Sequence, residues 1–206
     1  MDLPAALPGG PVAVGTPTAG APGADVSVRP AVVADAADIA RVQGLTWRTA
    51  YRSVLPAAVL DGWDDDTAAT SWATAVSAPP TAAHGVLVAR EKDALVGFAA
   101  FGPPDLSGGE STSPDGPTTE VAALLVEPRW GRRGHGSRLL AAVADTAAGT
   151  GARRLQMWLP VGDTVTAGFL EAAGWARDGW VRTLDTGSGP LVVHSWHALL
   201  GEAGPS

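Results

Sequence analysis

The chain has 206 residues, of which 46% are hydrophobic and 17% are charged, so we expect one globular domain rather than a disordered polymer or a membrane protein. Its net charge of −7 and its single lysine, Lys92, argue against a broad nucleic-acid surface, which needs clustered cations. The absence of cysteine excludes a disulfide framework, a thiol nucleophile and a cysteine metal site.

The first segment is predicted to be a flexible tail. Residues 1–24 are almost entirely Ala, Pro, Gly, Val and Thr and show no hydrophobic period, so they cannot bury enough surface to offset the entropy of ordering. They also lack the charged start and the unbroken apolar run of a signal peptide, and no segment approaches transmembrane length. We therefore expect a cytoplasmic protein with one domain over residues 25–201 and a short C-terminal tail over residues 202–206.

The domain should begin with a strand and two helices. Residues 26–29 alternate as a strand, and Asp35 and Asp38 resemble an acidic helix cap. A second helix is expected over residues 66–76, with Trp72 and Val76 inward. The apolar stripe of the first helix comprises Ile39, Val42 and Leu45, extended by Trp47 and Tyr51.

The following segments predict a mixed α/β order with mostly antiparallel strands. Residues 85–90 and 95–101 favour a hairpin, and residues 103–119 are rich in Pro, Gly and Ser, which predicts a long mobile loop. The later elements expected from hydrophobic spacing are a strand over 120–126, a helix over 137–148, a strand over 155–159, a helix over 164–173 closed by Gly174, and a hairpin formed by 181–184 and 191–197.

The segment that carries the clearest chemistry is residues 124–137, where a strand ends at Pro128 and glycines open a helix. Gly134 and Gly136 let the backbone approach a ligand, and the unpaired amides and dipole of a helix start favour an anion. Two further readings stay open for this segment alone: a tight turn with solvated arginines, and a generic nucleotide or phosphate binder. It is not a P-loop, because no Gly-Lys-Ser/Thr follows.

This segment resembles the central motif of the GNAT superfamily of N-acetyltransferases, in which Gln/Arg-x-x-Gly-x-Gly/Ala follows a strand that ends in Val-x-Pro. Here Val126-Glu127-Pro128 precedes Gly134-His135-Gly136 at the spacing of that family. The similarity covers roughly residues 25–200 and also includes Arg29-Pro30-Ala31, Trp47 to Tyr51, and Phe169-Leu170-Glu171-Ala172-Ala173-Gly174-Trp175.

The resemblance implies an α/β fold with a mixed, mostly antiparallel, splayed sheet, and transfer of acetyl from acetyl-CoA to a small-molecule or peptide amine by direct attack. No nucleic acid, membrane or metal partner is implied, and a homodimer is plausible by resemblance. Asp163 stands where the family often has Asn before the last helix, although a plain helix cap explains it equally well. The residues implied for the cofactor are Leu124, Leu125 and Val126 along the pantetheine, Arg132, Arg133, Gly134, His135, Gly136 and Ser137 around the phosphates, and Asp163.

The sequence departs from the family pattern at three positions. Gly131 replaces the usual Gln or Arg, His135 replaces an aliphatic residue, and Leu170 stands where many relatives place the tyrosine that protonates the departing thiolate. Tyr51, the sole tyrosine, is a candidate general acid, or it packs and shapes the acceptor pocket. Trp47 is a candidate for lining the acceptor site. The missing tyrosine leaves a non-catalytic acyl-CoA-binding or regulatory domain as the alternative.

A base matters more than an acid for this chemistry. Deprotonating an amine of pKa near 10.4 at pH 7 costs about 4.6 kcal/mol, whereas releasing a thiol of pKa near 8.5 as thiolate costs roughly 2 kcal/mol. Glu120 is the candidate base, and strand alternation is expected to place Glu120, Ala122, Leu124 and Val126 on one face. The competing reading is a solvated carboxylate at a strand end. A backbone amide near Val126 is expected to stabilise the oxyanion.

Overall fold

The computed structural model describes residues 26–53, 55–104, 113–187 and 189–201. The predicted tails, 1–24 and 202–206, lie outside the described residues, as does much of the predicted 103–119 loop. None of the helices within these ranges is long and apolar enough to cross a membrane.

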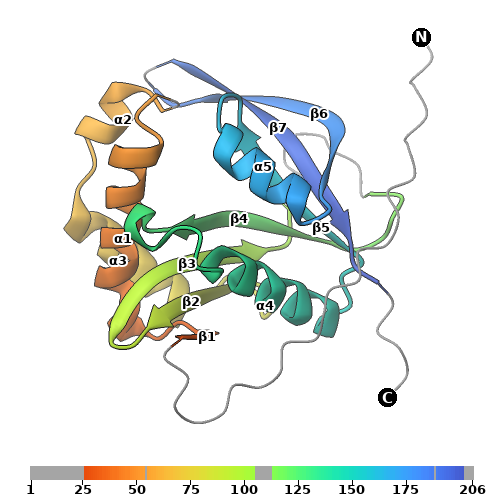
Figure 1. The fold of residues 1–206 in the computed structure, drawn as a ribbon, viewed down its shortest axis with the longest axis horizontal. Coiled ribbons are helices and arrows are strands. Elements are labelled where there is room, and N and C mark those ends of the chain that lie inside the picture. Colours follow the sequence, from red (N-terminus) through yellow and green to blue (C-terminus); the bar gives the residue numbers. More distant parts are fainter. Residues whose placement is uncertain (1–25, 54, 105–112, 188, 202–206) are drawn as a thin grey trace.

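The described residues form a seven-stranded sheet in the order β1-β2-β3-β4-β5-β7-β6 (Figure 1). Every neighbouring pair is antiparallel except β4 and β5, which confirms the prediction of a mixed, mostly antiparallel sheet. The strands are β1 (Val26–Pro30), β2 (Gly85–Glu91), β3 (Ala94–Gly102), β4 (Thr118–Val126), β5 (Arg154–Pro160), β6 (Ala176–Asp185) and β7 (Pro190–Leu199).

Helices cover both faces of this sheet (Figure 1). One apolar cluster joins α1 to β2, β3 and β4, and α3 adds Trp72, whose ring packs edge-on against Phe98. A second cluster joins α4 and α5 to the opposite face. We call these the α1 face and the α4 face. The helices are α1 (Ala36–Ala50), α2 (Ala57–Asp61), α3 (Asp65–Ser77), α4 (His135–Gly149) and α5 (Thr164–Ala172), with 3-10 turns η1 (Val33–Asp35) and η2 (Pro128–Trp130).

The first helix begins where the sequence predicts, but Asp35 does not cap it. The Asp35 carboxylate instead accepts two hydrogen bonds from the Arg29 guanidinium, at 2.7 and 2.8 Å, and one from the Val32 amide at 2.8 Å. The Arg29 hydrogen bond is the main reason that the pKa of Asp35 lies below its ordinary value. Asp35 therefore fastens α1 to β1. The predicted stripe was wrong at Leu45, which is exposed, because Thr46 takes the buried position beside it.

The fourth strand contains the irregularity on which the site depends. Its pairing with β3 shifts by one residue so that Ala122 has no partner in the ladder, which is a β-bulge. The bulge exchanges the two faces of the strand, so Val121 and Leu124 pack on the α4 face while Ala123 packs on the α1 face. The prediction that Glu120 shares a face with Leu124 was therefore wrong: Glu120 lies on the α1 face.

The same strand separates from β5 just beyond its start. The parallel pairing between β4 and β5 joins only Thr118, Thr119 and Glu120 to Arg154, Leu155 and Gln156. From Val121 to Val126, β4 is paired with β3 but not with β5 along the described residues. The backbone groups on the β5 side of this stretch are consequently available to a ligand.

Candidate functional site

The glycine-rich segment forms a tight loop at the mouth of α4. Gly134 is the N-cap of α4 with φ 80°, and a Cβ there would lie 3.0 Å from the Arg138 Nη1 atom. Arg132 also has a positive φ, 59°, which is uncommon for a residue with a side chain. This backbone turns the loop around the first amides of α4, which have no carbonyl partner within the helix. The predicted anion socket therefore has suitable local geometry.

Two loop residues predicted to cradle phosphates are tied to the end of β2. The His135 Nε2 atom lies 2.9 Å from the Glu91 carboxylate, and the Arg133 Nη1 atom donates to the same group at 3.2 Å. The His135 side chain is 0% exposed, so it points into the protein and only its backbone can reach a ligand. The Arg133 guanidinium lies 4.9 Å from the ring centre of Trp130. Glu91 thus holds the loop in place.

Sequence reasoning missed two residues that shape this loop. Glu91 lies 44 residues before His135, and no local pattern connects them. Arg138 donates a 3.0 Å hydrogen bond to the Arg133 carbonyl. A signal for Arg138 was present, because a cation four residues after the glycine N-cap stands in the first turn of the helix. Arg138 adds positive charge at the same end of α4.

The predicted pantetheine-lining residues on β4 divide between the two faces of the sheet. Leu124 and Val126 pack on the α4 face, whereas the side chain of Leu125 is buried on the α1 face. Only the backbone of Leu125 can therefore line a ligand that lies along the α4 side.

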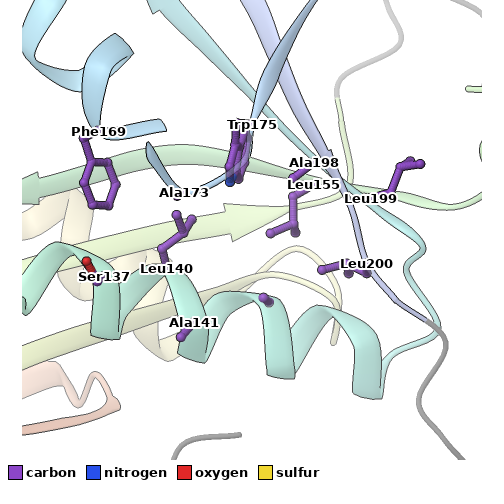
Figure 2. A pocket seen from close by; sticks show the side chains of 11 residues that line it. Ser137, Leu140, Ala141, Leu155, Phe169, Ala173, Trp175, Ala198, Leu199 and Leu200 are labelled. Atoms are coloured by element: carbon purple, nitrogen blue, oxygen red, sulfur yellow. The ribbon is translucent and has the colours of Figure 1, made fainter. Parts of the chain in front are cut away.

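An apolar groove runs between α4 and α5 and starts at Ser137, the last residue of the predicted phosphate loop (Figure 2). Figure 2 shows the Phe169 ring extending from α5 toward the first turns of α4. The neighbouring Leu170 is fully buried in the core. Position 170 therefore packs the core in this chain. The other residues lining the groove are Leu140, Ala141, Ala144, Leu155, Ala173, Trp175, Ala198, Leu199 and Leu200.

Tyr51 reaches the first turn of α5 from the end of α1. Its hydroxyl lies 3.4 Å from the Thr166 hydroxyl, and Asp163 caps α5 by accepting a 2.9 Å hydrogen bond from the Thr166 amide. Burial, and then the nearby Asp163 carboxylate, raise the pKa of Tyr51 above its ordinary value. The second carboxylate oxygen of Asp163 is buried and has no hydrogen-bond partner among the described residues. Tyr51 is thus a protonated donor beside a helix end.

Glu120 belongs to a row of cross-strand neighbours on the α1 face. Cross-strand pairing places Gly102, Glu120, Gln156 and His197 side by side on β3, β4, β5 and β7. Burial is the main cause that lowers the pKa of His197, which favours its neutral form. Glu120 therefore stands in a polar row at the point where β4 and β5 begin to separate.

The amide of Gln156 is held firmly within this row. Its oxygen accepts from Arg154 at 3.3 Å, and its nitrogen donates to the Ser195 hydroxyl at 3.0 Å. Ser195 in turn donates to Asp178 at 2.8 Å, and Asp178 also pairs with Arg154. This network holds the Gln156 side chain in a fixed orientation beside Glu120.

Trp47 lies on the side of the sheet that carries Glu120. Its half-buried ring packs edge-to-face against Trp63 with ring centres 4.9 Å apart, and it adjoins the α1 cluster. These contacts support a packing role, and its predicted role in acceptor binding stays a prediction. No group of three or more potential metal ligands gathers within the described part of the chain.

The sequence is similar to known acetyltransferases. A model of the Acetyltransferase (GNAT) family matches residues 45–175. An uncharacterized N-acetyltransferase, YuaI, from Bacillus subtilis is 31% identical over 135 residues, covering 65% of this chain and 71% of that protein. A mycothiol acetyltransferase from Kineococcus radiotolerans is 44% identical over 93 residues, which span 44% of this chain but only 26% of that protein.

The fold is also similar to that of solved structures. The structure of yncA, a putative acetyltransferase from Salmonella typhimurium with its cofactor acetyl-CoA, superposes with a TM-score of 0.61 and 19% identity. That alignment covers 88% of this chain and 97% of the other. At this identity the likeness shows the fold alone.

Proposed function

Because the chain belongs to the acetyltransferase (GNAT) family, we propose that its β4 edge and the α4 loop hold acetyl-CoA while Glu120 prepares an amine on the opposite face of the sheet. The chain is an N-acetyltransferase that takes its acetyl group from acetyl-CoA. The observation that carries the proposal is the separation of β4 from β5 beyond Glu120, directly before a glycine loop at a helix N-terminus.

The residues around the loop fit a diphosphate. The amides of Gly136 and Ser137 stand in the first turn of α4, where unpaired N–H groups and the helix dipole favour an anion. Arg132 is exposed, whereas Arg133 already pairs with Glu91. We therefore assign phosphate contact to backbone amides, with Arg132 and Arg138 supplying charge. The unpaired edge of β4 suits the amide groups of a pantetheine arm.

Glu120 is the proposed base. A protonated amine gives an N–H proton to the carboxylate, and its freed lone pair then attacks the thioester carbonyl carbon. The new C–N bond forms, the nitrogen gives a second proton to water, and the C–S bond breaks, so that the products are the amide and the CoA thiolate. An amide of β4 near Val126 is the proposed oxyanion donor. The bulge at Ala122 supports this arrangement, because it directs Glu120 to one face while the strand beyond it serves the other.

Tyr51 is the proposed hydrogen-bond donor to the leaving sulfur. Leu170 cannot serve, because it is a buried hydrocarbon side chain. The Tyr51 hydroxyl lies beside Thr166, one helical turn before position 170 on α5. Its raised pKa keeps it protonated at neutral pH, so it can stabilise the thiolate by donating a hydrogen bond. The membership of an acetyltransferase family favours this catalytic reading over a non-catalytic acyl-CoA-binding domain.

Turnover of acetyl-CoA with an amine panel tests the proposal. Free thiol release would be followed with primary alkylamines, polyamines, amino acids and short peptides, beside a sample without amine. We expect amine-dependent release from the wild-type chain and acetylated product by mass spectrometry. Calorimetry with CoA would show whether the cofactor binds. Binding without turnover of any amine would favour the non-catalytic alternative, and a preference for ATP over CoA would favour a generic nucleotide binder.

A further inference from the structure

His84 occupies a space on the α1 face that only a glycine leaves open. A Cβ atom at Gly102 would lie 2.4 Å from the imidazole Cδ2 atom and 2.9 Å from Nε2, closer than side chains can pack. The ring therefore lies directly over Gly102 at the end of β3. Gly102 is the cross-strand partner of Glu120, so the imidazole covers the position directly across from the proposed base.

The orientation of the imidazole is set by Thr81. The Nδ1 atom of His84 lies 2.9 Å from the Thr81 hydroxyl oxygen, which also accepts from the Ala83 amide at 3.3 Å. Because Nδ1 faces Thr81, the opposite edge of the imidazole ring, which carries Nε2 and Cδ2, covers Gly102. Directly opposed Cβ atoms on antiparallel strands are about 5 Å apart, so the Glu120 carboxylate can reach this edge.

We propose that His84 orients the Glu120 carboxylate and takes from it the proton that the acceptor amine gives up. The inference rests on the proposed role of Glu120. The amine N–H bond breaks as a Glu120 O–H bond forms, and that proton then passes to the Nε2 lone pair, which is available when Nδ1–H donates to Thr81. Glu120 returns to its carboxylate form. The half-buried imidazole releases the proton to water.

The nearby Arg154 is already engaged, because it is paired with Asp178 and lies 3.8 Å from Asp115. His197, two strands from Glu120, has a pKa lowered by burial and by Arg154 and is therefore neutral near pH 7. His84 is thus better placed than His197 to accept the proton. Its ring lies over Gly102, which is the cross-strand partner of Glu120.

The test is the pH dependence of His84→Gln in the full chain, with the alkylamine from the panel that the wild type acetylates fastest. We expect kcat to fall about tenfold to a hundredfold at pH 7, which is at or below the lower end of general acid–base contributions because His84 acts through Glu120, with KM for acetyl-CoA unchanged. The loss should narrow as the pH approaches the amine pKa of about 10.4, because the amine then arrives deprotonated. His194→Gln, on the other face of β7, is the matched control and should behave as wild type.

Gly102→Ala tests the same placement while the histidine remains. The added methyl group should displace the imidazole and reproduce the loss in kcat, whereas Gly149→Ala, which meets no neighbouring atom, should not. Thr81→Ser should retain activity and Thr81→Val should lose part of it. CoA calorimetry and thermal unfolding would establish that each variant is folded.

Two results would overturn the inference. One is a His84→Gln variant with wild-type kcat throughout pH 6 to 10, and the other is a loss of the same size at every pH, as a purely structural role produces. If the wild-type chain acetylates no amine, the proposed function itself fails, and the role of His84 fails with it.

Discussion

Glu120 and Leu124 are four residues apart on β4 yet lie on opposite faces of the sheet, because the strand is bulged at Ala122. In a regular strand both side chains would point the same way. Because of the bulge, the two side chains face different sides of the sheet: Leu124 faces α4 and α5, and Glu120 faces the side covered by α1. This arrangement separates the proposed base from the proposed pantetheine path.

Glu120→Gln should remove the base while keeping the shape of the side chain. We expect kcat with an alkylamine to fall by about a hundredfold or more at pH 7, since general bases contribute on that scale. KM for acetyl-CoA should change little, because Glu120 lies on the opposite face from Leu124. Steady-state kinetics between pH 6 and 10 check this, and full turnover across neutral pH would refute the base assignment.

Tyr51→Phe should lower kcat by roughly tenfold, the scale of one hydrogen bond to a developing charge. Because burial raises the pKa of Tyr51, the wild-type hydroxyl stays protonated beyond pH 10, and the pH–rate curves of the two proteins should run parallel. Thr166→Val removes the hydroxyl that lies beside the Tyr51 hydroxyl and should lower kcat by a smaller factor. Unchanged kcat in Tyr51→Phe would indicate that the ring only packs.

Glu91→Ala should weaken acetyl-CoA binding rather than the chemical step. Buried His135 would lose its partner and Arg133 its anchor, so the loop would be less well ordered. We expect KM for acetyl-CoA to rise roughly fivefold to tenfold, equivalent to about 1 kcal/mol, with kcat within twofold. Asp93→Ala, in the adjoining turn, is the control. A decrease in KM would mean that freeing Arg133 outweighs the loss of order.

Asp35→Asn should destabilise the fold in a pH-dependent way. At pH 7 we expect a loss of about 1–2 kcal/mol in the free energy of unfolding, because the variant loses a charged pair that fastens β1 to α1. Since the folded pKa of Asp35 is depressed, its stabilisation is complete above the unfolded pKa of about 3.9 and is lost as the pH falls through the folded value.

Urea unfolding at pH 7, 5, 3 and 2 would measure this difference between Asp35→Asn and wild type. Asp38→Asn is the control, because its exposed pair with Arg41 should contribute less than about 0.5 kcal/mol. A difference for Asp35→Asn that stayed constant down to pH 2 would contradict the assignment of the stabilisation to the Asp35 charge.

Local patterns in the sequence were sufficient for most elements and for the glycine-rich loop at the start of α4. Alternation and helical spacing predicted α4, α5 and the β2–β3 hairpin to within a few residues, because each depends on neighbours a few positions away. The motif around Gly134 could be recognised for the same reason. A turn with positive φ at the start of a helix favours glycine at that position, whatever lies elsewhere in the chain. The short helix α2 carries too few apolar positions to show a period.

The direction in which side chains point was decided only by the tertiary structure. The face of Glu120 depends on pairing between β3 and β4, and the anchoring of His135 depends on Glu91, far away in sequence. The meeting of Tyr51 with Thr166, 115 residues apart, and of His84 with Gly102 likewise arises from packing between elements. The sequence determined which groups are available, and long-range strand register and helix packing determined which of them meet, because one inserted residue in a strand reverses every side chain beyond it.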